Sequence, residues 1–341
     1  MTSFALLATP WRAFLPVMAI LSAAVPLAVL HGWQAPAGHG GLMLLVMVLG
    51  AICGYAPSAL PGWDGGPVPS PAVTAALLVL WLLTLAGAAA GVLWLIWALP
   101  VGLSLLLLRR RRGSAKRWVV SGAAMTISAL IVAGQPADAV LIAAALVAGI
   151  GARAVPAFLA GITGQRAADM PRIWPISTAL LVAAAIPCPP AALAAAGCVL
   201  AQMRAWSLSA VQRPAGAMLV AAWIGLAAGL AAHGFGLTTA ALHLLTMGAI
   251  APMIAAISTR AGMRRSGRAP VASPAAMTSV TLLMASACLR LAAAAGQVPL
   301  GAAYAVWCAG WAAYLTALAP ALHGPPLRPA FSGRRSGRSA D

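Results

Sequence analysis

The stretch AVTAALLVLWLLTLAGAAAGVLWLIWALPVGLSLLLLRRRR, residues 72–112, decides the fold. It contains two apolar runs, 72–90 and 92–108, and ends in four arginines. Each run approaches the roughly 20 residues that a helix needs to cross a bilayer. Lipid leaves the backbone only helices or closed barrels, and barrel strands alternate apolar with polar residues. These unbroken runs therefore predict two transmembrane helices that end at a basic loop.

The rest of the chain repeats this pattern. Of its 341 residues, 62% are hydrophobic and 7% are charged, whereas soluble domains carry about 25% charged residues. Such a composition predicts an integral membrane protein, all-α, formed by one domain over residues 1–323. With ten further runs we expect about twelve transmembrane helices: 14–30, 41–60, 119–133, 139–160, 174–186, 191–203, 215–232, 237–258, 275–295 and 301–322.

Basic residues predict the orientation of these helices. The net charge is +17, and the loops 134–138, 187–190, 233–236 and 296–300 carry no lysine or arginine. The loops between them are basic, as cytoplasmic loops of membrane proteins are. We therefore expect both termini in the cytoplasm and an even number of helices, with a disordered basic tail over residues 324–341. Because cytoplasmic loops account for the basic residues, we expect no nucleic-acid partner. We expect membrane lipid around the helices.

Histidines gather on the side opposite to the basic loops. His31, His39 and His233 stand at helix ends there, and His243 lies about 10 Å into its helix at 1.5 Å per residue. Arg290 falls inside another apolar run, where a cation is costly without a partner. Imidazole is the usual axial ligand of haem b and also binds copper, and arginine can pair with haem propionates. The alternative, which we favour for His31 and His233, is that they are interfacial residues only.

The segment HLLTMGAIAPMIAAISTRAGMRRSGR, residues 243–268, closely resembles the most characteristic stretch of the NnrS family. That stretch has a His, then Leu-Thr, Gly-Ala, an apolar helix with Met, Thr-Arg-Ala and a final Gly-Arg. Residues 38–65, GARAVPAF at 151–158 and PPLRPAFSGRRSG at 325–337 are similar to other parts of the family pattern. The resemblance covers nearly the whole chain.

Members of this family are haem- and copper-containing bacterial membrane proteins linked to the response to nitric oxide, some of them to denitrification. The resemblance implies a multi-pass protein of the bacterial inner membrane, with haem b and copper as cofactors and nitric oxide as a ligand. It also implies His39 and His243 as metal ligands. The cofactor-binding residues that it implies are His39, Met218, His243, Thr246 and Arg290.

The chain departs from the family pattern at several polar positions. Gly41 and Leu42 stand where the family has a second His and a Glu after His39, and Met218 and Arg265 each replace a His. Methionine can ligate haem iron or Cu(I), so Met218 and Met43 remain candidate ligands. Simple packing of both methionines is the alternative.

Two other functions remain open on the sequence. Twelve helices with both ends inside is a common transporter layout, although the halves show no clear repeat and the spans lack the carboxylates that usually couple protons. The lost polar positions also allow a metal-free family member with a structural or interaction role. No hydrolase or transferase motif is visible, and whether the protein is an enzyme through redox chemistry at a haem stays open.

Overall fold

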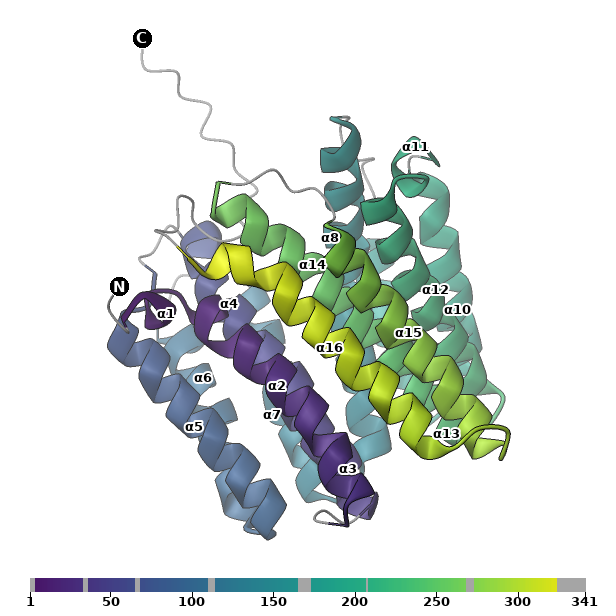
Figure 1. Cartoon of the computed structure of the whole chain (residues 1–341), viewed down its shortest axis with the longest axis horizontal. Helices are drawn as coiled ribbons and strands as arrows, with labels where there is room; N and C mark the ends of the chain where they lie inside the picture. Colours follow the sequence, from purple (N-terminus) through teal and green to yellow (C-terminus); the bar gives the residue numbers. More distant parts are fainter. Residues whose placement is uncertain are drawn as a thin grey trace.

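The computed structural model describes residues 4–32, 36–64, 68–109, 114–164, 173–206, 208–267 and 273–323. These residues form a bundle of helices without a strand (Figure 1). Among them, eight continuous helices are long and apolar enough to cross a membrane: Pro10–Leu30, Gly38–Trp63, Pro71–Ala90, Pro136–Thr163, Pro214–Gly234, Thr238–Arg265, Pro274–Ala294 and Leu300–Leu322. The all-helical fold predicted from the sequence is thus confirmed, and these eight helices have the length and composition of membrane spans. The predicted disordered tail, 324–341, lies outside the described residues.

Each of the twelve apolar runs is helical in the structure. Six of them form single helices, each with the same bounds as one of the spans above: α2 (Pro10–Leu30), α5 (Pro71–Ala90), α8 (Pro136–Thr163), α12 (Pro214–Gly234), α15 (Pro274–Ala294) and α16 (Leu300–Leu322). Four are shorter: η2–α6 (Leu93–Trp97 and Ala98–Leu108), α7 (Lys116–Val132), α9 (Ile173–Ala184) and α10 (Ala191–Gln202). Short turns of helix, α1 (Phe4–Leu7), η3 (Met203–Ala205) and α11 (Leu208–Val211), connect them.

The two remaining runs are helices with a π-helical segment in the middle. The first consists of α3 (Pro36–Leu44), η1 (Leu45–Leu49) and α4 (Gly50–Asp64); the second consists of α13 (Thr238–His243), η4 (Leu244–Ile250) and α14 (Ala251–Arg265). A π-helical segment rotates the side chains that follow it and is frequent at functional sites. Both segments lie beside the candidate site described below.

Proline and glycine set the helix boundaries. Pro71 and Pro274 occupy the first helical position, and the hydroxyls of Ser70 and Ser273 accept hydrogen bonds from the first turn. Gly91, with φ at 72°, ends α5 in the left-handed conformation that glycine adopts without strain. The short separation between the third and fourth apolar runs is therefore a true helix end.

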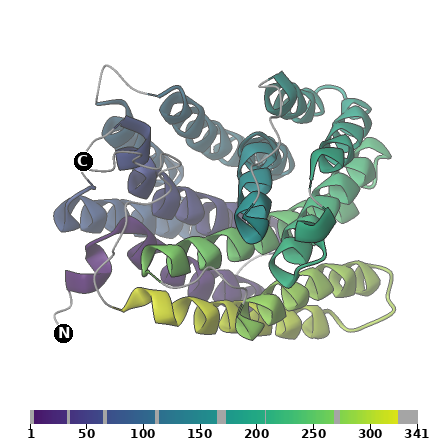
Figure 2. The same ribbon diagram turned by 90° about the horizontal axis from the view of Figure 1, so that it is seen from above.

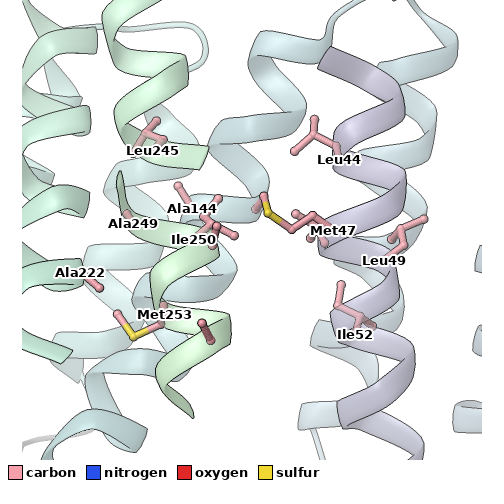
Figure 3. Packing of buried hydrophobic residues seen from close by; sticks show 14 of the residues in the cluster. Leu44, Met47, Leu49, Ile52, Ala144, Ala222, Leu245, Ala249, Ile250 and Met253 are labelled. Atoms are coloured by element: carbon pink, nitrogen blue, oxygen red, sulfur yellow. The ribbon is translucent and has the colours of Figure 1, made fainter. Parts of the chain in front are cut away.

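The two π-containing helices face each other in the bundle. Figure 3 shows Met47 of η1 extending toward Ile250 of η4, with Ala144 of α8 behind them. On their outer sides, α4 packs against α2, and η4 packs against α12 and α15. Because α16 also packs along α2, the two ends of the described chain lie side by side (Figures 1 and 2).

The two ends of the bundle differ in their basic and histidine residues. We call the end at which α2 begins and α14 finishes the basic end, near the N-terminus in Figure 1. Most described lysines and arginines lie there: Arg12, Arg109, Lys116, Arg117, Arg204, Arg213, Arg260, Arg264 and Arg265. The opposite end, at which α3 and α13 begin, we call the histidine end; His31, His39, His233 and His243 lie there.

Candidate cofactor site

A cavity of about 230 Å³ lies at the histidine end. Six parts of the fold line it: α2, α3 with η1, the start of α8, α13 with η4, the last part of α15 and the start of α16. We call it the histidine cavity, defined by His39, Met43, Met47, His243, Thr246, Met247, Arg290, Tyr304 and Trp307 together with neighbouring apolar residues.

Four of the five cofactor-binding residues expected from the resemblance line this one cavity. They are His39, His243, Thr246 and Arg290, which come from α3, from α13 with η4, and from α15. The positive charge of Arg290 and the ring of His39 both act electrostatically on the ring of His243. The fold therefore brings two imidazoles and one guanidinium to a common space.

The ring of His243 has a fixed orientation. Its Nδ1 lies 2.7 Å from the carbonyl oxygen of Thr239, one turn earlier in the helix. A carbonyl only accepts hydrogen bonds, so Nδ1 carries the proton and Nε2 keeps its lone pair. A histidine that ligates a metal usually donates its other N–H to a carbonyl or carboxylate in this way. His243 thus has the tautomer that a ligand through Nε2 requires.

Thr246 and Trp307 are held by hydrogen bonds to the backbone. The hydroxyl of Thr246 donates to the carbonyl of Leu242 at 2.7 Å, and the indole N–H of Trp307 donates to the carbonyl of Ser22, also at 2.7 Å. With its N–H bound, Trp307 contributes an aromatic wall to the cavity.

Arg290 is a half-buried cation in the last part of α15. Within the described part of the chain its guanidinium has no hydrogen bond or ion pair, and none of the residues that line the cavity is acidic. A cation within an apolar span is costly and normally meets an anion. Its planar fork suits a carboxylate.

These residues fit haem as a ligand set. An imidazole with a free Nε2, a second imidazole and a carboxylate-binding arginine converge on a space with aromatic and aliphatic walls. Among the described residues no three of His, Cys, Asp and Glu come together as a closed metal site.

Methionines contribute more to the cavity than the sequence indicated. Met43 was a candidate, and Met47 and Met247 line the same cavity. No spacing in the sequence singles out the last two, which lie within the two π-helical segments. Thioether sulfur is a soft ligand that favours Cu(I) and can bind haem iron.

Met218 lies elsewhere. It is buried on α12 and lines a small cavity with Thr259, Arg260 and Met263, toward the basic end. The structure therefore does not bring Met218 together with His39 and His243. His31 and His233, for which we favoured an interfacial position, do not line the histidine cavity either.

The family model described as NnrS protein matches residues 5–325 of the chain. A comparison with curated proteins gave no match. Because the family match spans nearly the whole chain, it agrees with the resemblance seen in residues 243–268 and elsewhere. This chain therefore belongs to the NnrS family.

Proposed function

We propose that this protein is a haem-binding member of the NnrS family that takes part in the bacterial response to nitric oxide. The observation that carries the proposal is the histidine cavity, where His243 presents a free Nε2 beside His39 and Arg290. Bound haem b supplies an iron centre to which nitric oxide can bind.

Each residue of the cavity has a distinct task in this proposal. His243 and His39 hold the group from two helices, and the Thr239 carbonyl keeps the His243 ring turned toward the cavity. Arg290 binds a propionate and so orients the group. Tyr304 and Trp307 form a wall that limits the access of water.

The basic end sets the orientation that we propose. Cytoplasmic loops of membrane proteins are enriched in lysine and arginine, so the basic end faces the cytoplasm of a bacterial inner membrane. In this orientation both termini lie in the cytoplasm, and the chain crosses the membrane an even number of times, about twelve. The histidine cavity then lies on the periplasmic side.

Copper is a second candidate for the same cavity. Two imidazoles with the sulfurs of Met43, Met47 and Met247 make a mixed N and S donor set of the kind that Cu(I) favours. Haem remains our first candidate because Arg290 would pair with the carboxylates of haem, whereas a copper ion carries no carboxylate.

The absorption spectrum of the purified protein tests the proposal. The protein, in detergent and supplied with haem, should show a Soret band that shifts on reduction and on addition of nitric oxide. His243→Ala should lose most of this band. His233→Ala is the matched control, because His233 lies at the same end but outside the cavity.

Absence of the band in the wild type, or an unchanged band in His243→Ala, would contradict the proposal. A metal-free wild type by elemental analysis would favour a structural role instead. Solute uptake into proteoliposomes that is intact in His243→Ala would favour a transporter.

A further inference from the structure

A second cavity, of about 180 Å³, lies between the two π-containing helices and α8, nearer the basic end. Within the described residues, α8 packs closely against α3 and η4, whereas α4 and α14 show no comparable packing against each other or against α8. The three helices therefore separate around this cavity, and small residues such as Ala51 and Ala154 leave the space open. We call it the isoleucine cavity, defined together with neighbouring residues by Ile52, Ile150, Ile250, Ile254 and Ile257.

The walls of the isoleucine cavity offer water few partners. Besides the indole of Trp11, the polar side chains among the described residues that line it are those of Tyr55, Ser258 and Arg265. Each of these three already interacts with the protein: Ser258 shares a hydrogen bond with Tyr314 at 2.9 Å, and Tyr55 and Arg265 interact electrostatically with each other. A buried water needs about two to four polar partners, whereas apolar cavities of roughly 150 Å³ stay dry and bind apolar molecules such as xenon.

The isoleucine cavity continues the histidine cavity along the same three walls. On α8, Val140 lines the histidine cavity and Ala143, less than one turn later, lines the isoleucine cavity. On η1 the change falls between the neighbouring residues Met47 and Val48, and η4 also lines both cavities. The two spaces are therefore adjacent within one bundle.

Met47 and Ile250 lie where the two cavities meet. Each is 1% exposed, and Figure 3 shows Met47 extending across the space toward Ile250. Methionine is unbranched and flexible, so its side chain can change rotamer within a packed core. Such a change at Met47 would join the two cavities without the movement of a helix.

We infer that the isoleucine cavity binds a small, uncharged, apolar gas such as nitric oxide and passes it by Met47 to the histidine cavity. Apolar solutes leave water for apolar surroundings, and the isoleucine cavity is not sealed from the surroundings of the bundle. The gas thus enters from lipid and does not cross a polar surface. The transfer step rests on the proposed function, whereas the gas site itself does not.

Crystals of the haem-free protein under xenon pressure test the gas site. We expect an anomalous peak between Ile52, Ile150 and Ile250 in the wild type. Ala154→Phe, which fills the cavity from α8, should abolish the peak. Ala157→Phe changes an exposed residue of the same helix and, as the matched control, should keep it. A wild type without the peak, or with density for an acyl chain in its place, would overturn the inference.

The association rate of nitric oxide with the haem-loaded protein tests the transfer step. Ala154→Phe should lower this rate about threefold or more with an unchanged Soret band, because the gas then waits for the helices to open. Ala157→Phe should associate at the wild-type rate. Ile250→Ala, which widens the boundary between the cavities, should associate faster. Equal rates in Ala154→Phe and the wild type would overturn the transfer step.

Two further controls keep the tests separate. If the size-exclusion profile shows that Ala154→Phe does not fold, Ala51→Leu fills the cavity from α4 with a smaller side chain and should give the same two results. If the wild type binds no haem, the proposed function fails, and the xenon peak still decides whether the isoleucine cavity is a gas site.

Discussion

The Nδ1 atom of His243 lies 2.7 Å from the carbonyl oxygen of Thr239, directly before the helix changes from α to π geometry. This contact fixes the tautomer and leaves Nε2 available to the histidine cavity. His39 reaches the same cavity from α3, six residues before the other π-helical segment begins.

Replacement of Arg290 should weaken haem retention without abolishing it. Arg290→Gln loses a charge-assisted bond to a propionate, which predicts roughly tenfold faster haem loss to a scavenger protein. The rate of haem loss from Arg290→Lys should lie between the rates of Arg290→Gln and the wild type. Arg153→Gln changes an exposed arginine in α8 and serves as the control. Equal rates in Arg290→Gln and the wild type would remove this residue from the site.

Met47 should distinguish copper from haem. Met47→Leu keeps the apolar volume but removes the sulfur from a side chain that is 1% exposed. If copper occupies the histidine cavity, its stoichiometry by elemental analysis should fall, whereas haem held by His39 and His243 should remain. Loss of haem together with copper would make Met47 part of the haem site.

A methyl group at Gly225 should disturb the packing of α12 against η4, which carries Thr246 and Met247 of the histidine cavity. A Cβ there would lie 2.2 Å from the carbonyl oxygen of Gly248 in η4, so α12 and η4 would have to move apart. We expect Gly225→Ala to cost about 1–3 kcal/mol of stability and to lower haem retention as well.

Thermal unfolding in detergent measures this effect. Gly197→Ala is the control, because a Cβ at Gly197 meets nothing within 4 Å. Because alanine is a better helix former than glycine, Gly197→Ala should gain about 0.5–1 kcal/mol of stability. The close packing of α12 on η4 would be contradicted if Gly225→Ala unfolded at a temperature as high as that of Gly197→Ala.

Trp81 should stabilise the first π-helical segment. Its indole N–H donates to the carbonyl oxygen of Leu45, the first residue of η1, at 2.9 Å in a fully buried position. Trp81→Phe leaves that carbonyl without the indole donor and should cost about 1–3 kcal/mol. Trp94→Phe changes an exposed indole and should have little effect. Unfolding temperatures of the two variants, measured side by side, check the prediction.

The sequence predicted the helices well because lipid imposes one simple rule. Every long apolar run must satisfy its backbone internally, so runs such as 139–160 could only be helices. The separation of basic residues from histidines could also be predicted, since alternate crossings bring residues such as His39 and His243 to one end. The cavity that they share depends on side-chain direction, for which apolar runs carry no periodic signal.

Other parts of the site could not be predicted for the same reason. The π-helical segments have no sequence signature, and they contain Met47 and Met247, which line the cavity. Arg265 was counted among the charges of a basic loop, but tertiary packing buries it against Trp11. Met218 was a candidate through its position in the family pattern, yet α12 places it in a different cavity.

The most direct test of the account is near-infrared magnetic circular dichroism of the haem-loaded ferric protein, which reports the two axial ligands of the iron. We predict a band of histidine ligation in the wild type and in His233→Ala, its loss in His243→Ala and a changed ligand set in His39→Ala. Absence of histidine ligation in the wild type, or an unchanged band in His243→Ala, would contradict the account.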